Sequence, residues 1–365
     1  METVIYGKKS LYFVLTIFLA NMCMSHVLNA AEKYWRPYGP RAPWNIPVKG
    51  IPIHPDSDYF ASLLWNDSTA SRPGNFNTGF DGYTYPVYEV TSETDIYRVE
   101  ITNNWGANMD GKSMPWNPDW IPAEGDDAQI IVLDPEYGYE WNFWQVNVDE
   151  DNKIVYASNG NLVQRGIIGG DGSDPGNYWT KENGFKPSRG CGIQYLAMLV
   201  RPQEVAAGKI EHALSMPIIN TDGDYFVPPA TKLEHPNNPS GIPEGMRFAL
   251  DVTDEEIEIW VNSFPPQLSE TTRNSARILA RALRDYGWFV TDTSGGAFFQ
   301  FESRLTAGAE WDALGLNNQT VNWIEYPRDL FDGLITEDRI YALVPSDEYP
   351  TSNDIEPPSH LRLMN

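Results

Sequence analysis

The sequence predicts a mainly β fold: a jelly-roll-like β-sandwich with two or three short helices and long loops. The 29 glycines and 28 prolines in 365 residues suit many turns and short strands better than a helical bundle. From residue 83 to residue 170 the dominant hydrophobic period is two, as in half-buried strands. With 41% hydrophobic and 13% aromatic residues, the chain can build a sizeable core, which excludes general disorder.

The first 30 residues have the pattern of a secretory signal peptide. Lys8 and Lys9 supply positive charge at the start. The apolar stretch from Leu11 to Met24 is 14 residues long, and the small Ala30 follows it. This stretch is short for a membrane span, and no other segment approaches the roughly 18 apolar residues that a span needs. We therefore predict a secreted or periplasmic protein with no membrane span after cleavage; an uncleaved N-terminal anchor is the alternative.

The net charge of −24, from 26 basic and 50 acidic residues, makes nucleic acid a poor candidate partner because so acidic a chain repels phosphate backbones. Of the two cysteines, Cys23 lies within the signal segment, so only Cys191 stays in the mature chain. One cysteine forms no intrachain disulfide, and stability must come from the core or from bound ions. The sequence does not fix an oligomeric state.

Three segments are expected after the signal. Residues 31–56 hold six prolines and form an extended N-terminal strap. Residues 57–344 form a single β-sandwich domain. Residues 345–365 are rich in Pro, Ser and Asp and form a loosely held tail. A short helix is expected from Asp56 to Trp65, with its apolar side chains facing inward.

A hairpin is expected in the first half of this domain. Residues 128–133 are nearly all apolar and predict a buried strand, and residues 134–138 have turn chemistry. Residues 139–148 return as the second strand of the hairpin. A turn over 149–152 and a strand over 153–158 follow.

Two helices interrupt the strands further along the chain. Residues 201–214 have Pro202 in the first turn, where a proline is tolerated. Residues 270–286 carry one apolar stripe and are preceded by the capping residue Ser269. Residues 288–302 then have the pattern of a further hairpin.

Aromatic residues are the strongest functional signal. All 13 tryptophans follow the signal segment. Several lie in loops rich in Gly and Asn, namely Trp105, Trp116, Trp120 and Trp179. Sugars present C–H faces that stack on indole rings, and Asn, Asp or Gln side chains bind their hydroxyls. These positions predict glycan binding; the alternative is that the tryptophans fill the core.

The strand over 139–148 concentrates these signals. Glu140, Asn142 and Trp144 point to one face, and Gln145 lies on the other. If the first face lines an open cleft, Glu140 acts as acid, base or nucleophile in glycoside cleavage. The second carboxylate of the pair stays open, with Asp134, Asp149 and Asp171 as candidates. The alternative for Glu140 is a solvated edge residue.

A polysaccharide lyase is the second hypothesis. β-Elimination needs a base such as His or Tyr and a group that neutralises the uronate carboxylate. His212, at the end of the 201–214 helix, is the candidate base; the alternative is a packed or capping histidine. The remaining groups would be Tyr195, Gln194, Arg189 and Arg165. The net charge of −24 makes a polyanionic substrate less favourable.

Transition-metal motifs are absent from the sequence, which has no HExxH and no CxxC. Asn220, Asp222 and Asp224 place oxygens at alternate positions, as calcium loops do. They predict a structural Ca²⁺ site, with an ordinary turn as the alternative. No cofactor is expected to be required, and a common serine hydrolase is disfavoured because the GxSxG motif is missing.

Three stretches resemble a known group of proteins. They are residues 51–60 (IPIHPDSDYF), 201–214 (RPQEVAAGKIEHAL) and 280–296 (ARALRDYGWFVTDTSGG). Together they resemble a broad group of secreted bacterial proteins, mostly of unassigned function, that is associated with the β-sandwich architectures of carbohydrate-active enzymes. The resemblance implies a sandwich fold and a polysaccharide substrate. None of the stretches is a catalytic signature, so no catalytic residue is carried over.

The leading hypothesis from the sequence is a secreted enzyme that cleaves a polysaccharide with a carboxylate pair that includes Glu140. One alternative is a lyase that uses His212 or a tyrosine as base. Another is a non-catalytic glycan-binding surface protein that uses the same tryptophans. The residues expected to bind substrate are Asn142, Trp144, Gln145, Arg165 and Trp179.

Overall fold

The computed structural model describes most of the chain after the expected signal segment. The described residues are 38, 42–69, 72–103, 107–164, 188–234 and 238–346. The predicted signal peptide over 1–30, Arg165, Trp179 and residues 347–365 of the expected tail lie outside them. No helix in the described part of the chain has the length and apolar character needed to cross a membrane.

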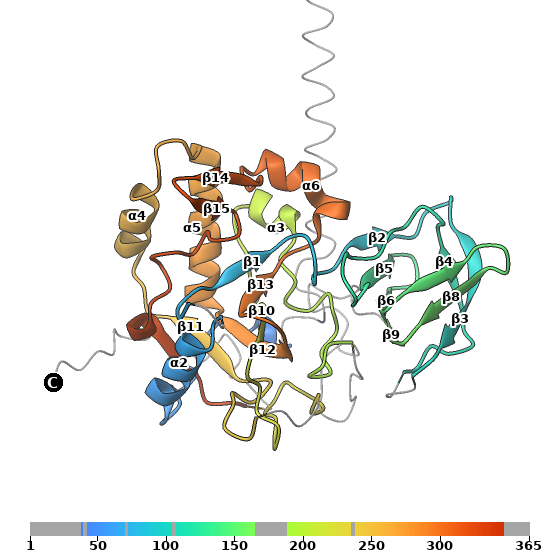
Figure 1. Ribbon diagram of the computed structural model, residues 1–365, viewed down its shortest axis with the longest axis horizontal. Coiled ribbons are helices and arrows are strands. Elements are labelled where there is room, and N and C mark those ends of the chain that lie inside the picture. Colours follow the sequence, from blue (N-terminus) through green and yellow to red (C-terminus); the bar gives the residue numbers. More distant parts are fainter. Residues whose placement is uncertain are drawn as a thin grey trace, which may run out of the picture.

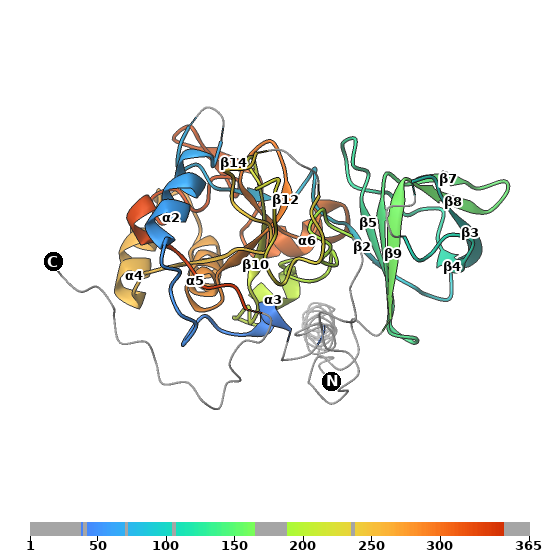
Figure 2. The ribbon, with the colours of Figure 1, turned by 90° about the horizontal axis from the view of Figure 1, so that it is seen from below.

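The described elements form two regions that lie side by side (Figures 1 and 2). Strands β2 to β9 make up the first, which we call the β-region (residues 87–164). The second, which we call the mixed region (residues 42–82 and 188–346), holds the described helices and the other strands. The chain therefore starts in the mixed region, leaves it to form the β-region, and returns.

Two four-stranded sheets build the β-region. The first has the order β2-β5-β6-β9 and consists of β2 (Val87–Glu89), β5 (Ile130–Asp134), β6 (Tyr139–Trp144) and β9 (Asn159–Gln164). The second has the order β4-β3-β8-β7 and consists of β4 (Ser113–Trp116), β3 (Asp95–Ile101), β8 (Ile154–Ala157) and β7 (Asn147–Asp149). Val99 of β3, Val132 of β5 and Phe143 of β6 are fully buried in one apolar core. The two sheets are therefore held together by a shared core.

The predicted hairpin of the β-region is present. β5 and β6 pair in antiparallel register, with Ile131 opposite Asn142. Every residue of β5 is buried, as its continuous apolar run predicts. The strand expected over 139–148 is interrupted, because Gln145 adopts a left-handed backbone conformation (φ 57°) between β6 and β7.

A sheet with the order β10-β12-β11-β16 forms the centre of the mixed region. Its strands are β10 (Leu214–Ile218), β12 (Trp288–Thr293), β11 (Arg247–Leu250) and β16 (Ile340–Ala342). β10 and β12 run parallel, whereas β11 is antiparallel to both of its neighbours. Two further pairs are β1 (Asn77–Gly79) with β13 (Phe298–Gln300), and β14 (Gln319–Val321) with β15 (Ile324–Tyr326).

The helices of the described residues all lie in the mixed region. They are η1 (Pro43–Asn45), α2 (Ser57–Asn66), α3 (Pro202–Ala206), α4 (Asp254–Asn262), α5 (Glu270–Asp285), α6 (Arg304–Ala313) and η3 (Glu337–Arg339). Ser269 caps α5, as predicted, by accepting a hydrogen bond from the N–H of Thr272. α5 packs against β11 and α4, while α2 packs against β16.

The prediction of a mainly β chain is confirmed, with 28% strand against 20% helix. The jelly-roll-like sandwich is not confirmed, since the described strands fall into five sheets with several parallel pairs. The predicted number of two or three short helices is too low, because α4 and α6 also form. A capping box at Thr253 and Glu256 is the sequence signal for α4. The single domain over 57–344 stays a prediction.

Two predicted elements of the mixed region are wrong. The helix over 201–214 ends at Ala206, because Gly208 adopts a positive φ of 86° and turns the chain toward β10. The hairpin over 288–302 does not form. β12 is bordered on both sides, by β10 and β11, so β13 pairs with β1 instead.

Buried contacts anchor the described part of the Pro-rich strap. Trp44 is fully buried. The buried guanidinium of Arg247 donates hydrogen bonds to the carbonyls of Pro43 and Ile46. Because Arg247 belongs to β11, the strap is fixed to the central sheet of the mixed region.

Candidate functional site

The candidate site lies where the parallel strands β10 and β12 end. Both strands run in the same direction, so their carboxyl ends meet at one edge of the sheet. The hydroxyls of Thr221 and Thr293 lie 2.8 Å apart at this edge. The N–H of Ser294 donates to the carbonyl of Ile218, which ties the two chain ends together. In open α/β sheets, ligands bind outside the carboxyl ends of parallel strands.

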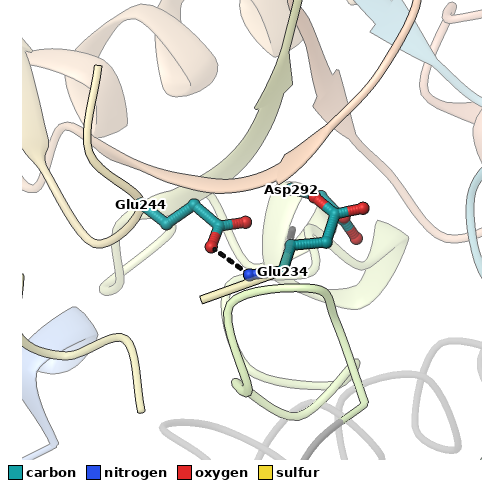
Figure 3. A group of neighbouring side chains, drawn as sticks. All are labelled: Glu234, Glu244 and Asp292. Carbon is teal, nitrogen blue, oxygen red and sulfur yellow. Dashed lines mark hydrogen bonds between the residues drawn. The ribbon is translucent and has the colours of Figure 1, made fainter. Parts of the chain in front are cut away.

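Three carboxyl groups meet at this edge, those of Glu234, Glu244 and Asp292 (Figure 3), and we call them the acidic cluster. Asp292 belongs to β12, whereas Glu234 and Glu244 come from the long connection between β10 and β11. One oxygen of each residue lies within 4.8 Å of the others. Glu244 is fully buried, and Glu234 and Asp292 are half-buried. The cluster therefore reaches solvent through Glu234 and Asp292.

Backbone N–H groups hold the three carboxyl groups in place. The N–H of Thr293 donates to Glu234 (3.0 Å), and the N–H of Gly190 donates to Asp292 (3.2 Å). The N–H of Glu234 donates to Oε2 of Glu244 (3.3 Å), the contact drawn in Figure 3. Oε1 of Glu244 is buried with no hydrogen-bond partner in the described part of the chain. Such an oxygen costs stability, which indicates a functional reason for its position.

Gly190 lets the backbone approach the acidic cluster closely. A Cβ atom at this position would lie 2.4 Å from Oδ1 of Asp292 and 2.7 Å from Cδ of Glu234. Any larger residue would displace these two carboxyl groups and disturb the N–H contact to Asp292. The glycine is therefore part of how the site is built.

The acidic cluster retains protons at neutral pH. Burial, and then the charges of Asp292 and Glu234, raise the pKa of Glu244 to about 9. Burial and the charge of Glu234 also raise the pKa of Asp292 well above its ordinary value. Neighbouring carboxyl groups with raised pKa values can donate and accept protons near neutrality. The cluster is thus suited to acid–base chemistry.

A nucleophilic thiol is not part of this chemistry. Cys191 is fully buried and lies close enough to the acidic cluster to interact with its charges. Burial, and then the charges of Glu244 and Asp292, raise the pKa of its thiol well above the ordinary value. The thiol therefore stays protonated and unreactive at neutral pH.

Three of the groups that the sequence suggested for a lyase lie in the protein interior. Arg189, Gln194 and Tyr195 are all buried. Arg189 donates to Oε1 of Gln300 (3.2 Å) and to the carbonyl of Tyr195 (2.9 Å), and its guanidinium lies 5.2 Å over the ring of Tyr85. Its donors are directed at neutral groups of the interior rather than at an open site.

Glu140 and Asn142, on one face of β6, are fully buried between the two regions. The N–H of Leu196 donates to Oε1 of Glu140 (3.0 Å), and the hydroxyl of Tyr38 donates to Oε2. The N–H of Tyr195 donates to Oδ1 of Asn142 (3.0 Å). Burial raises the pKa of Glu140, although its hydrogen bonds oppose the rise. This face of β6 joins the β-region to the mixed region and is not an open cleft.

Trp144 and Gln145 are half-buried and hold a neighbouring loop. Nε1 of Trp144 donates to the carboxylate of Asp127 (2.9 Å). Gln145 donates to the carbonyl of Asp126 (3.2 Å) and accepts from the hydroxyl of Ser158 (2.6 Å). Both side chains therefore bind residues of the β-region rather than residues of the acidic cluster. Arg165 and Trp179 lie outside the described residues.

His212 lies in the connection between α3 and β10 rather than in a helix. Its Nε2 is 3.0 Å from the carboxylate of Glu204, and its Nδ1 is 2.8 Å from the carbonyl oxygen of Ala213. Burial by itself lowers the pKa of His212, but the charge of Glu204 and these two hydrogen bonds outweigh burial, so the pKa is raised. Contacts within the protein therefore occupy both ring nitrogens.

The predicted calcium residues Asn220, Asp222 and Asp224 follow β10. Oδ1 of Asp222 accepts hydrogen bonds from the N–H groups of Asp224 (2.7 Å) and Tyr225 (3.3 Å). An aspartate that binds the backbone two residues ahead is typical of a turn. Calcium binding at this loop stays a prediction.

Sequence reasoning missed all three residues of the acidic cluster. Glu234 and Glu244 lie in a long connection, where nothing in the neighbouring sequence separates them from solvent-exposed acids. Asp292 does carry a signal, because it is an acid near the end of an otherwise apolar strand, WFVTDT. An acid at the carboxyl end of a buried strand is a candidate site residue once a parallel neighbour is known.

No family model matches the chain, and no curated protein or solved structure matches it. The resemblance of the three sequence stretches to secreted carbohydrate-active proteins stays a prediction. The function is therefore inferred from the chemistry of the acidic cluster.

Proposed function

We propose that the protein is a secreted enzyme that hydrolyses glycosidic bonds of a polysaccharide at the acidic cluster. Asp292 and Glu234 are the reacting pair, and the buried Glu244 is a positioning residue behind them. The observation that carries this function is the meeting of Asp292 and Glu234, two half-buried carboxyl groups with oxygens within 4.8 Å of each other, at the edge of parallel strands. Glycoside cleavage usually uses such a pair of carboxyl groups.

The two carboxyl groups take the roles of acid and nucleophile. Asp292, whose pKa is raised by burial and by Glu234, gives its proton to the glycosidic oxygen as the bond to the anomeric carbon breaks. Glu234, held by the N–H of Thr293, attacks the anomeric carbon as a carboxylate and forms a glycosyl ester. Water then cleaves this ester while Asp292 takes up the water proton, which restores both groups.

The spacing of the pair predicts the stereochemical outcome. Carboxyl groups about 5–5.5 Å apart are typical of enzymes that retain the anomeric configuration, and a spacing of about 6.5–9.5 Å is typical of inversion. Oxygens of Asp292 and Glu234 lie within 4.8 Å of each other, which leaves no room for the water that inversion needs. We therefore expect retention, measured by NMR as the anomer released first.

The proposed reaction is the one expected from the sequence, but its carboxylate pair does not include Glu140. Both oxygens of Glu140 accept hydrogen bonds inside the protein. A lyase is disfavoured because contacts occupy both nitrogens of His212, and because a chain with net charge −24 repels polyuronates. Secretion through a signal peptide in residues 1–30 stays part of the proposed function. So does substrate binding by Arg165 and Trp179. A β-sandwich is proposed for the β-region alone.

Isosteric variants test the acidic cluster. Asp292→Asn and Glu234→Gln keep the side-chain shape but remove proton transfer, so each should lower kcat by roughly 10²–10⁴-fold without lowering thermal stability. Glu255→Gln, in an exposed acid of α4, is the matched control and should keep full activity. Activity is measured as reducing-end release from a panel of polysaccharides. Ultraviolet absorbance of the products separates hydrolysis from β-elimination.

Three results would contradict this function. Full activity of both cluster variants would place the reaction elsewhere in the protein. An unsaturated product would show a lyase. Thermal stabilisation of the wild type by Ca²⁺ or Mg²⁺, abolished in Glu244→Gln, would show that the cluster holds a cation instead of exchanging protons.

A further inference from the structure

The hairpin of β14 and β15 exposes a tryptophan at its tip. Trp323 is 97% exposed, and it is the only exposed residue among the ten tryptophans in the described part of the chain. Indole is a large, mainly apolar ring whose transfer out of water is favourable. Full exposure is therefore unfavourable for the isolated protein.

The backbone at the tip is also unfavourable for this residue. Val321 pairs with Ile324, which leaves Asn322 and Trp323 as the two turn residues. Both have positive φ angles, 52° and 70°. Such a turn strongly favours Asn followed by Gly, so Trp323 occupies the position that glycine normally takes. Since neither folding nor solvation favours tryptophan here, we look for a ligand that covers the indole.

A groove of about 570 Å³, lined by both polar and apolar groups, lies at the base of the same hairpin. Thr320 and Glu325, which pair with each other across the hairpin, line it together with residues 78–82. Glu325 is two residues from Trp323, and a strand rises roughly 3.3 Å per residue, so the tip lies about 7 Å from the groove along the strand. An exposed aromatic ring and a groove of hydrogen-bonding groups are thus neighbours on one surface.

The charge of the groove favours a neutral ligand. Its charged lining residues are Asp81, Glu325 and Arg328, two carboxylates against one guanidinium. Arg328 forms ion pairs with Glu325 and with Asp329 (2.9 Å). A polyuronate would meet a net negative surface, whereas the hydroxyls of a neutral sugar meet both donors and acceptors.

We propose that Trp323 and this groove form a surface site that binds a chain of neutral polysaccharide. The indole stacks on a sugar ring, and the groove binds the hydroxyls of neighbouring sugars. In Figure 1 the β14–β15 hairpin lies away from β12, the strand that carries Asp292. The choice of ligand rests on the proposed function, and the site narrows the substrate class to neutral glycans.

Binding and cleavage, measured separately, test this site. Affinity electrophoresis in gels that contain β-glucan, xylan, galactomannan or polygalacturonate gives the dissociation constants of the wild type and of Trp323→Gly. We expect Trp323→Gly to weaken binding to a neutral glycan about tenfold, equivalent to about 1.4 kcal/mol. Its hydrolysis of short oligosaccharides should not change. Because glycine suits this turn, the variant should unfold at the same temperature as the wild type or higher.

Conservative and control variants sharpen the test. Trp323→Tyr keeps an aromatic ring and should keep most of the binding. Tyr137→Ala is the matched control, because Tyr137 is 60% exposed between the strands of the β5–β6 hairpin. It should bind like the wild type.

Several results would overturn the inference. Equal binding by the wild type and Trp323→Gly would do so, as would tighter binding to polygalacturonate than to any neutral glycan. A dimer that dissociates in Trp323→Gly, seen by analytical ultracentrifugation, would show that a second copy covers the indole. Binding that depends on Trp323, together with full activity of Asp292→Asn, would instead overturn the proposed function and leave this site standing.

Discussion

Each region of the molecule contributes a fully buried glutamate, and the two glutamates differ in their partners. Glu140 belongs to the β-region and Glu244 to the mixed region, and burial raises the pKa of both. At Glu140 two donors, the N–H of Leu196 and the hydroxyl of Tyr38, oppose this rise. At Glu244 the charges of the other cluster carboxylates add to it, and one oxygen has no partner in the described residues.

Burial and a raised pKa therefore do not by themselves mark a functional acid. A carboxylate whose oxygens are both satisfied, as at Glu140, connects elements: here it fixes β6 to the segment that contains Leu196. A carboxyl group surrounded by like charges, as at Glu244, opposes folding, and proteins keep such arrangements chiefly at functional sites. The partners of an acid distinguish the two cases.

The largest expected loss of stability follows removal of the Glu140 carboxylate. Glu140→Ala removes the acceptor of the Leu196 N–H and of the Tyr38 hydroxyl, so the free energy of unfolding should fall by about 2–4 kcal/mol. Glu140→Gln keeps an oxygen for the N–H and an amide for the hydroxyl, and should cost less than about 1.5 kcal/mol. Urea unfolding measures both. If Glu140→Ala were as stable as the wild type, Glu140 would not connect the two regions, and the contrast with Glu244 would fail.

A third buried carboxylate, Glu204, pairs with His212. Loss of this ion pair should have an intermediate effect on the free energy of unfolding. The folded pKa of His212 is raised above its ordinary value of 6.5. Its contribution to stability is therefore fully present below pH 6.5 and is lost as pH rises through the folded pKa. His212→Gln should lower the free energy of unfolding by about 1–3 kcal/mol in acid and by less in alkaline solution. Thermal unfolding across pH measures it, and a loss that grows with pH would contradict the ion pair.

Local sequence patterns predict the elements of this fold better than their pairing. The continuous apolar run of β5 and the capped, striped α5 are both present as expected. The partners of β12 depend on segments far apart in the chain, and an alternating pattern over 288–302 fits a hairpin equally well. The helix over 201–214 failed for a local reason, because Gly208 turns the chain.

The same limit applies to the candidate site. Alternation in β6 correctly separates Phe143, which faces the core of the β-region, from Glu140 on the other face. Alternation does not predict what covers that other face. In the structure, the segment with Tyr195 and Leu196 covers it. The acidic cluster combines a strand residue with two residues of a long connection, so only the folded chain brings its members together.

The effect of opposite sign is a gain in stability at Glu244. Its pKa rises from an ordinary value of 4.5 to about 9 in the folded protein, so unfolding releases a proton between these pH values. The contribution of the protonated group is fully present below pH 4.5 and is lost as pH rises toward about 9. Glu244→Gln is neutral throughout. It should raise the free energy of unfolding near pH 8, by up to about 5 kcal/mol from linkage between these pKa values, and change it little near pH 4.

The pH window separates this effect from that of the ion pair. Glu244→Gln should flatten the stability profile already between pH 4.5 and 6.5, where His212→Gln keeps the slope of the wild type. Thermal unfolding with and without EDTA is the control. Suppose that Glu244→Gln is less stable than the wild type near pH 8 and that EDTA lowers the wild-type Tm. A bound cation would then satisfy the cluster as hydrogen-bond donors satisfy Glu140. The two buried glutamates would no longer differ, and the support for acid–base chemistry in the mixed region would be lost.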